Sequence, residues 1–236
     1  SPVAETFRGL LELLGGRAGR SEVLDWLAGE PARARFGLDE EAVERFAEWA
    51  EGSGIRFGLD EDHRESLGLA PARRHTWAAG LERLALAHAV GASAEVFEGT
   101  APVPLDPFSD PDVLGAVGEL ESMLRSGQAM ISSPRDVSSW CQVMIDLLER
   151  SCDQTDSNAQ EHSTIRGLLQ GISAGAESAG FEEVIPFEAI REQVCDALGS
   201  SPAPQAFLAG GVTFCELVPL RAIPFKVIAI MGMSDN

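Results

Sequence analysis

The chain has 236 residues, of which 44% are hydrophobic, and its formal net charge is −19 at neutral pH. This length and apolar content suffice for one large or two small cores, which excludes a disordered or fibrous chain. No apolar run approaches the roughly 18 residues of a membrane-spanning helix, and the first residues lack the basic and apolar regions of a signal peptide. We therefore expect a globular protein of the cytoplasm.

The negative charge is unevenly distributed along the chain. Residues 1–100 carry 11 basic and 18 acidic groups, residues 101–205 carry 5 and 17, and residues 206–236 carry 2 and 2. Affinity for nucleic acid comes largely from Lys and Arg side chains that displace counterions from phosphates. The middle segment would repel a phosphate backbone, so we do not expect it to form a DNA track by itself.

Helical periodicity dominates the first two hundred residues. Apolar side chains between Phe7 and Leu14 share one helical face, and we expect Gly15-Gly16 to end this helix in a left-handed conformation. Ser21, Asp39 and Thr76 are each expected to cap the start of a further helix. The pattern therefore predicts short helices joined by short turns.

Four prolines predict a loop over residues 101–112. Helices are expected to resume over residues 113–126 and, after the start signal Ser133-Pro134, to continue as far as Ser151. Residues 153–162 are polar and are expected to be poorly ordered. Two more helices are predicted near residues 164–179 and 187–198. A short strand at Val212–Cys215 and an apolar strand at Lys226–Met233 are then expected.

The cysteines, tryptophans and isolated histidines have structural interpretations. The cysteines are too widely spaced for a zinc site, so we interpret them as free buried thiols. The tryptophans lie on apolar helical faces and favour core packing over base stacking. The histidines have no ligand partner at metal spacing, which favours packing or surface positions. These residues are Cys141, Cys152, Cys195, Cys215, Trp26, Trp49, Trp77, Trp140, His88 and His162.

The C-terminal segment carries a family resemblance. Residues 212–233 resemble the strand, loop and strand of motif V in the second RecA-like domain of UvrD-type helicases. The closest resemblance is to the altered form in RecC, the gamma chain of exodeoxyribonuclease V. In active relatives the loop reads roughly His-Ser/Ala-Ala-Lys-Gly-Leu-Glu-Phe. Val218 stands here at the His position, Arg221 at the Lys, Ala222 at the Gly and Pro224 at the Glu, so the resemblance implies an inactivated motor.

A second stretch resembles the same family. The RecC pattern reads Gly-Ile-Arg-Trp-Gly, His-Arg, Gly-Leu-Pro and Asn-Thr-Trp-Arg-x-Gly-Leu-x-Arg-Leu. The matching phrases here are Gly54-Ile-Arg-Phe-Gly58, His63-Arg64, Gly68-Leu69 and His75-Thr-Trp-Ala-Ala-Gly-Leu-Glu-Arg-Leu84. Phe57 replaces Trp, Ala70 replaces Pro and His75 replaces Asn. Looser similarity begins at Ser1 and is weakest over residues 100–200.

The resemblance implies a mainly α fold, in which a helical 2B-like helicase subdomain is followed by a short β segment of a RecA-like 2A α/β domain. Residues 1–100 would form the first part of the 2B-like region, residues 101–112 the proline-rich loop, and residues 113–204 the second part. Residues 205–236 would be a partial 2A-like strand-loop-strand. Because two strands rarely form a stable sheet alone, we interpret the chain as an internal fragment of a longer protein.

The resemblance also implies a function without catalysis in this region. A P-loop needs glycines followed by Lys and Ser or Thr, and the single lysine, Lys226, follows Phe225. RecC-like chains contribute to DNA-end processing, strand guidance and recognition of the recombination signal Chi. Their expected partners are DNA and RecB-like and RecD-like subunits, with no membrane. ATP and Mg²⁺ would be used by those subunits, and we expect no cofactor, catalytic residue or metal ligand in this fragment.

Four residues are candidate DNA contacts. By resemblance, Arg221 lies in a loop where single-stranded DNA crosses the motor domains, and Asp235 follows the next strand. Arg64 and Arg74 belong to the densest basic region, which would contact DNA phosphates or an acidic partner surface. The favoured alternative is structural: the arginines of this region would pair with nearby acids and hold residues 54–76 against the helices. These arginines are Arg56, Arg64, Arg73, Arg74 and Arg83. Those acids are Asp60, Glu61, Asp62, Glu65 and Glu82.

Two further interpretations of the whole chain stay open. It would be part of an active UvrD-like or AddB-like helicase-nuclease if motor or metal sites lie outside this window. It would be a helical interaction module if the C-terminal similarity is due to chance. Val218, Ala222 and Pro224 at the motor positions argue against the first, and the phrases of residues 54–84 argue against the second.

Overall fold

A computed structural model describes residues 1–91, 96, 97, 99–103 and 110–200. These residues form α-helices and no strand, with isolated bridges between Phe97 and Thr100 and between Arg135 and Ile185. The expectation of a mainly α chain is confirmed for this part. The strands predicted within residues 205–236 lie outside the described residues, as do Arg221 and Asp235.

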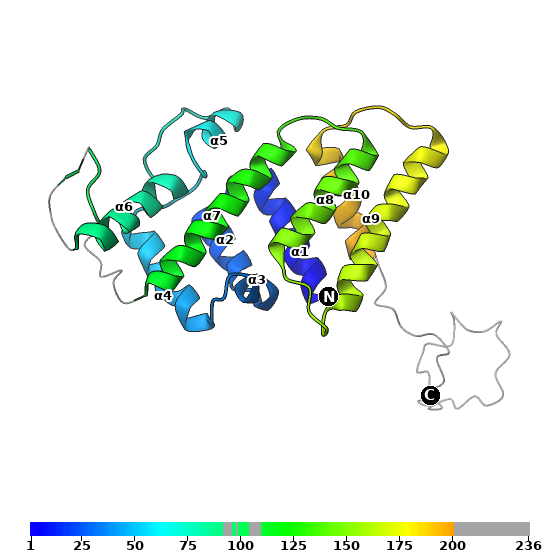
Figure 1. Cartoon of the computed structure of the whole chain (residues 1–236). Coiled ribbons are helices and arrows are strands. Elements are labelled where there is room, and N and C mark those ends of the chain that lie inside the picture. The colour runs from blue at the N-terminus through cyan, green and yellow to red at the C-terminus, as the bar shows by residue number, and fades with distance from the viewer. Residues whose placement is uncertain (92–95, 98, 104–109, 201–236) are drawn as a thin grey trace, which may run out of the picture. The chain divides into compact units, whose positions relative to one another are not determined.

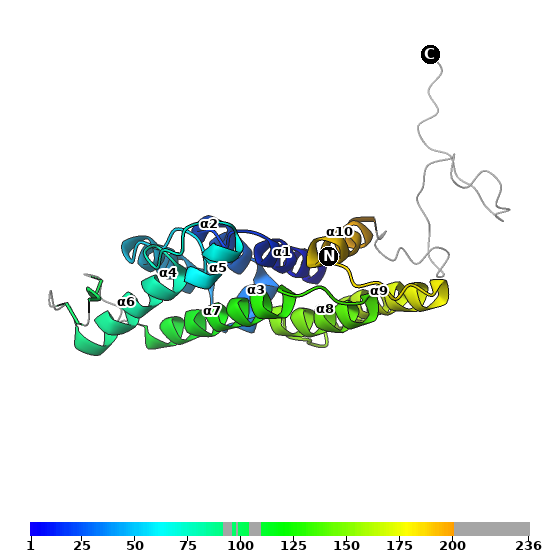
Figure 2. The same cartoon turned by 90° about the horizontal axis from the view of Figure 1, so that it is seen from above.

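The helices follow one another with short connections. In chain order they are α1 (Pro2–Gly15), α2 (Arg20–Leu27), α3 (Glu30–Arg35), α4 (Glu40–Gly52), α5 (Glu61–Ser66), α6 (Trp77–Val90), α7 (Pro111–Ile131), α8 (Val137–Ser151), α9 (Ala159–Ala179) and α10 (Phe187–Ser200). Helix α1 is central, because it contacts α2, α3, α7, α8, α9 and α10. Figure 1 shows α7, α8 and α9 side by side, and Figure 2 shows α1 and α10 in a second layer against them.

Helix α1 occupies this position because its apolar face is continuous. Phe7, Leu10, Leu11 and Leu14 are all at most 2% exposed. Helix α7 approaches α1 closely at Gly127, where a Cβ atom would lie 2.9 Å from Cδ2 of Leu14. Glycine allows this close approach, because a Cβ atom here would force the buried Leu14 side chain or one of the helices to shift.

The ends of the first helices match the expectations in part. Asp39 and Thr76 cap α4 and α6, accepting backbone N–H groups at 2.8 Å and 3.2 Å. Ser21 was wrong as a cap: α2 begins at Arg20, and the carboxylate of Glu22 accepts the N–H of Gly19, the residue before the helix, at 3.0 Å. The left-handed end predicted for α1 was also wrong, because Gly16 has an extended backbone with φ −105°.

The start of α8 differs from the one that Ser133-Pro134 predicts. Ser133-Pro134 was expected to begin the helix, but α8 begins at Val137 and Asp136 is its cap, accepting the N–H of Ser139 at 2.9 Å. Arg135 is held instead in an extended bridge, exchanging backbone hydrogen bonds with Ile185 at 3.1 Å and 2.8 Å. This long-range pairing excludes the first helical turn that the local sequence favours.

Three other boundaries differ from the sequence expectations. Helix α7 begins at Pro111, inside the predicted proline loop, and continues to Ile131. Helix α9 begins at Ala159, so the second half of the polar stretch is ordered. Helix α10 continues to Ser200, two residues beyond its predicted end at residue 198. Residues 104–109 of the proline loop lie outside the described residues.

The tryptophans are buried, as expected, and the indole N–H groups of three of them also join their helices to distant segments. Trp26 donates to the carbonyl oxygen of Thr6 at 2.8 Å, Trp77 to Ala18 at 2.7 Å, and Trp140 to Ile185 at 2.8 Å. Each link satisfies a buried donor while fixing a long-range contact. Trp49 is 4% exposed.

The cysteines of the described part are free thiols. Cys141 and Cys152 are buried as expected, whereas Cys195 is half-buried, and burial raises the pKa of all three thiols. Cys215 lies outside the described residues. Within the part of the chain that the structure describes, no helix has both the length and the apolar character needed to cross a membrane.

Two buried histidines make stability depend on pH. Burial is the main cause that lowers the pKa of His162, with Arg166 acting in the same direction, and burial also lowers the pKa of His63. In the folded state these groups stay neutral where the unfolded chain takes up a proton. Their contribution to stability is therefore complete above about pH 6.5 and is lost as the pH falls below it.

We expect the free energy of unfolding in urea titrations to decrease from about pH 8 to pH 5. The decrease should be shallower in a His162→Gln variant, because one of the two groups no longer titrates. Equal pH dependence in the variant and the unsubstituted chain would contradict this assignment.

Candidate interaction surface around residues 54–76

Residues 54–76, called here the 54–76 loop, connect α4 to α6 and include the short helix α5. Its turns are made by glycines with positive φ: 80° at Gly54, 80° at Gly58 and 73° at Gly68. Residues that carry a Cβ atom rarely adopt a positive φ. At Gly58 a Cβ atom would also lie 2.9 Å from Cγ of Arg64, so the loop and the Arg64 side chain require glycine there.

Arg64 holds the loop together from inside. It is 5% exposed, and its guanidinium donates to the carbonyl oxygens of Ala72 at 2.6 Å and Phe57 at 3.0 Å. The same group lies 4.3 Å from the centre of the Phe57 ring, a cation–π distance. Arg64 therefore joins both arms of the loop, and a phosphate contact by Arg64 stays a prediction that this geometry does not favour.

His75 is the second organising residue of the loop. Its φ is 67°, a left-handed value that is uncommon for a residue other than glycine. This conformation turns its carbonyl oxygen to accept the N–H groups of Arg56 at 3.0 Å and Phe57 at 3.3 Å. The ring Nδ1 lies 2.8 Å from the carbonyl oxygen of Gly54, which can only accept, so Nδ1 carries the hydrogen.

Helix α6 fixes the loop from its other side. The N–H groups of Trp77 and Ala78 each donate to loop carbonyl oxygens at 2.9 Å, those of Gly58 and Leu59. At Gly80 a Cβ atom would lie only 2.1 Å from Cγ1 of Ile55. Glycine at this position therefore lets the loop lie directly on the helix.

The ion pairs expected for this region form only in part. Arg73 pairs with Glu82, and Asp60 caps α5 and pairs with Arg125 at 3.2 Å. Arg83 donates instead to the carbonyl oxygens of Ser53 and Ala101, at 2.7 Å and 2.9 Å. The structural interpretation of Arg64 and Arg83 is thus supported, but their partners are backbone carbonyls and not the predicted acids.

Backbone hydrogen bonds bring three basic segments to one edge of the loop. Arg20 donates its N–H to the carbonyl oxygen of Arg56 at 2.8 Å, and Gly58 donates to that of Arg17 at 2.8 Å. Arg74 precedes His75, whose carbonyl oxygen holds Arg56. We call Arg17, Arg20, Arg56 and Arg74 the basic rim. Arg17, Arg56 and Arg74 are exposed, and Arg20 is half-buried.

Comparison with known proteins identifies the family. The model of the RecBCD enzyme subunit RecC fourth domain matches residues 1–202, most of the chain. The chain belongs to the RecC family. The match favours the RecC interpretation over a helicase-nuclease motor or an unrelated helical module.

Individual RecC proteins match across the same length. The chain is 30% identical over 235 residues to the RecBCD enzyme subunit RecC of Escherichia coli K12, covering 100% of this chain and 21% of that protein. The values for the RecC of Mycolicibacterium smegmatis are 26% over 238 residues, with 100% and 21% covered. For Haemophilus influenzae RecC they are 24% over 226 residues, with 96% and 20% covered. The chain thus spans about a fifth of the RecC relatives that it matches.

The geometry of the 54–76 loop explains the RecC phrases. Gly54 and Gly58 supply left-handed turns, Arg64 joins the two arms, and Gly80 admits Ile55. The RecC pattern has Asn where His75 stands, and Asn adopts left-handed φ more readily than most residues. Within the described residues, these phrases therefore have a role in folding the loop.

We expect His75→Asn to leave the free energy of unfolding within about 0.5 kcal/mol of the unsubstituted chain. His75→Val should lower it by about 1–2 kcal/mol, because a β-branched residue resists left-handed φ. Both variants lose the imidazole ring, so the difference between their free energies of unfolding in urea measures the backbone effect. Equal stability of the two variants would contradict a backbone role for residue 75.

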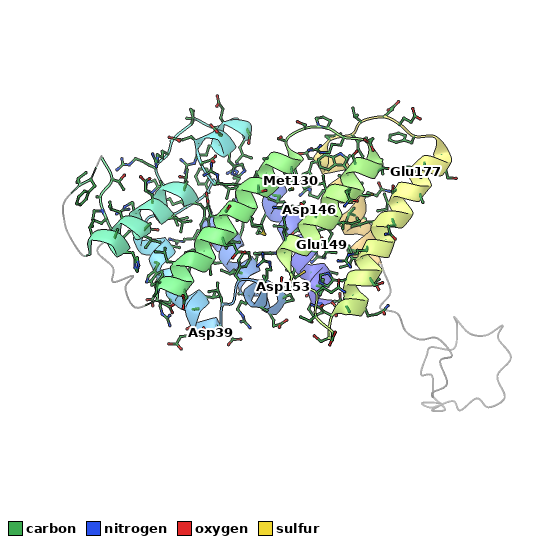
Figure 3. All side chains as sticks on the ribbon, in the orientation of Figure 1. Asp39, Met130, Asp146, Glu149, Asp153 and Glu177 are labelled. Carbon is green, nitrogen blue, oxygen red and sulfur yellow. The ribbon has the colours of Figure 1, made fainter. Side chains whose placement is uncertain are left out.

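The acidic side chains of α8 and α9 are engaged within the RecC domain. Figure 3 labels Asp146 and Glu149 on α8, Asp153 just after it, and Glu177 on α9. Asp146 pairs with Arg150 at 2.8 Å, Glu149 with Arg166 at 2.9 Å and Asp153 with Arg35 at 3.4 Å, while Glu177 accepts from Ser138 at 3.2 Å. Among the described residues, no group of three or more His, Cys, Asp or Glu side chains is placed to hold a metal ion.

Sequence reasoning identified part of this surface. It selected Arg64 and Arg74, which the structure places on one loop, the first buried and the second exposed. It missed Arg17 and Arg20, which lie far from the loop in sequence and reach it through backbone hydrogen bonds to Arg56 and Gly58. No local motif marks those two arginines, so periodicity and spacing could not have found them.

Proposed function

We propose that this chain is a non-catalytic, helicase-like region of the gamma subunit of exodeoxyribonuclease V. In the whole protein it would contribute to DNA-end processing, strand guidance and Chi recognition during double-strand-break repair. The observation that carries the proposal is the RecC fourth-domain match over residues 1–202. The relatives named RecBCD enzyme subunit RecC support RecB-like and RecD-like subunits as partners.

The finer division of the chain is part of this proposal. Residues 1–100 and 113–204 would be the two parts of a 2B-like subdomain joined by the proline-rich loop 101–112, and residues 205–236 would belong to a 2A-like domain. The helical character of the described part supports the first assignment. The proposal retains Arg221, Asp235 and Arg74 as DNA contacts in the assembled enzyme. Arg64 is retained as a fourth candidate, although its hydrogen bonds to Ala72 and Phe57 do not favour a phosphate contact.

The structure is compatible with a scaffold role for the 54–76 loop. Its glycines, Arg64 and His75 are all engaged in backbone geometry or hydrogen bonds within the chain. A loop organised in this way offers a fixed surface to a strand or a partner, with no group poised for chemistry among the residues described.

The test is assembly of the full-length parent protein with the RecB-like and RecD-like subunits of the same genome. The proposal predicts a three-subunit complex that degrades linear duplex DNA with ATP and Mg²⁺, while the chain alone hydrolyses no ATP. ATP hydrolysis by the purified parent alone, or its failure to associate with both subunits, would contradict the proposal.

A further inference from the structure

The guanidinium groups of the basic rim have neither a carboxylate partner nor a carbonyl partner among the described residues, whereas Arg64, Arg83 and Arg135, which also lack ion pairs, donate to backbone carbonyl oxygens. Among described residues, none of the guanidinium groups of Arg17, Arg20, Arg56 and Arg74 forms an ion pair. Elsewhere arginines meet carboxylates, as in Arg33 with Glu40, Arg35 with Glu119, Arg45 with Asp110, Arg125 with Asp60, Arg150 with Asp146 and Arg166 with Glu149. The guanidinium of Arg191, on α10, lies over Gly15.

Unpaired arginines are unexpected in a chain with a net charge of −19. With acids in twofold excess, each exposed arginine has many possible carboxylate partners. The backbone bonds between Arg20 and Arg56 and between Gly58 and Arg17 hold these arginines near one another, and like charges that lie close together repel. A bound anion would remove this repulsion.

A hollow of mixed polar and apolar lining adjoins Arg20 and Arg56 of the basic rim, while Arg17 and Arg74 do not line it. Its volume is about 580 Å³, and Arg20, Arg56 and His75 line it together with the backbone of Gly19 and Gly54. Two carboxylates also border it. Glu22 is held by the N–H of Gly19 at 3.0 Å, whereas Glu51 is exposed and is the group that would oppose an anion there.

An exposed turn of small and apolar residues adjoins the rim. Leu69 is 36% exposed, and Ala70, Pro71 and Ala72 are exposed as well. Arg64 fixes this turn by donating to the carbonyl oxygen of Ala72, and Arg74 follows the turn after Arg73. The surface therefore offers cations beside an apolar step, which matches a nucleotide strand with its anionic backbone and apolar base faces.

We propose that the basic rim binds the phosphate backbone of a DNA strand, with Arg17, Arg20, Arg56 and Arg74 as the contacting residues and the apolar turn beside the bases. The choice of DNA over an acidic protein surface rests on the function proposed above. Arg64 acts as a positioning residue that presents the turn. The contact is short, because the acidic surface elsewhere on the domain repels further phosphates.

Binding of a fluorescent single-stranded oligodeoxythymidylate to this chain tests the proposal. Each phosphate contact on a single strand contributes about −0.7 to the slope of log affinity against log salt, so four contacts predict a slope of about −3. The quadruple variant with Arg17, Arg20, Arg56 and Arg74 changed to Gln should bind at least about tenfold more weakly at low salt, and with a slope near zero. Glu51→Gln should tighten binding.

Matched controls use exposed arginines outside the rim. Arg8 and Arg150 are paired with Glu12 and Asp146 at exposed sites on α1 and α8. Arg8→Gln and Arg150→Gln should leave affinity and slope unchanged, whereas the single rim variant Arg56→Gln, which removes the same one charge, should weaken binding and make the slope shallower by about 0.7. Equal losses in the control variants would overturn the proposal, because binding would then follow net charge alone. Undetectable binding of the unsubstituted chain at low salt would also overturn it.

A competition arm separates DNA from an acidic protein partner. The DNA assignment is supported if polyglutamate displaces the oligonucleotide no better than its charge density predicts. Rim-dependent binding of polyglutamate without binding of the oligonucleotide would overturn it in favour of an acidic protein surface. Co-purification with RecB-like and RecD-like subunits should be unchanged in the quadruple variant, so failure of the rim can be told apart from failure of the proposed function.

Discussion

Replacing Trp77 with Ala is expected to lower the free energy of unfolding by about 3–5 kcal/mol. Trp77 is 1% exposed, and its ring lies 6.0 Å from that of Phe46. The substitution empties this space and also leaves the carbonyl oxygen of Ala18 without the indole donor that it accepts at 2.7 Å. A buried carbonyl without a donor adds to the cost of the cavity.

Trp77→Phe is the matched control for this substitution. It keeps most of the ring volume and removes the indole N–H, so the expected loss is about 1–2 kcal/mol. Urea unfolding followed by circular dichroism measures both variants. A Trp77→Ala protein within about 1 kcal/mol of the unsubstituted chain would show that the contacts between α6, α4 and the loop before α2 do not support the fold.

Replacing Gly80 with Ala is expected to lower the free energy of unfolding by about 2 kcal/mol, although Ala favours helices by about 1 kcal/mol over Gly. The new methyl group would lie 2.1 Å and 2.6 Å from Cγ1 and Cδ1 of Ile55. Either the 54–76 loop must shift or Ile55 must leave its buried position. Both outcomes should also expose the backbone bonds between the loop and α6.

Helix α7 offers a control with the opposite sign. At Gly115 and Gly118 an added Cβ atom meets open space, so Gly→Ala at either site should raise stability by about 0.5–1 kcal/mol. Combining Gly80→Ala with Ile55→Ala should cost less than the two single substitutions together, because the clash is removed. Additive losses in this double-mutant cycle would contradict direct contact between the two residues.

The sequence predicted the helices well where apolar periodicity decides the structure. Phe7 to Leu14 form the buried face of α1, and Asp39 and Thr76 cap the helices they were expected to cap. The errors fall where a distant segment competes with a local signal. Helix α8 does not begin at Ser133-Pro134, because Arg135 pairs with Ile185 about fifty residues away.

The candidate surface was predictable only in part. A dense run of charges marked Arg64 and Arg74, but composition could not show that Arg64 points inward to backbone carbonyls. Nor could it show that Arg17 and Arg20 join Arg56, because that contact is made through main-chain atoms. Hydrogen bonds between main-chain atoms do not depend on side-chain type, so the sequence could not show that Arg17 and Arg20 belong to the rim.

Amide hydrogen exchange tests most directly the central claim that the 54–76 loop is a rigid scaffold held by main-chain bonds. The N–H groups of Arg20, Gly58, Trp77 and Ala78 each donate to a carbonyl oxygen at 2.8 Å or 2.9 Å across this region. These four amides should exchange as slowly as the amides inside α1, with protection approaching that of global unfolding. Exchange of the same amides at the rate of the exposed amides of Ala70 and Ala72 would contradict the claim.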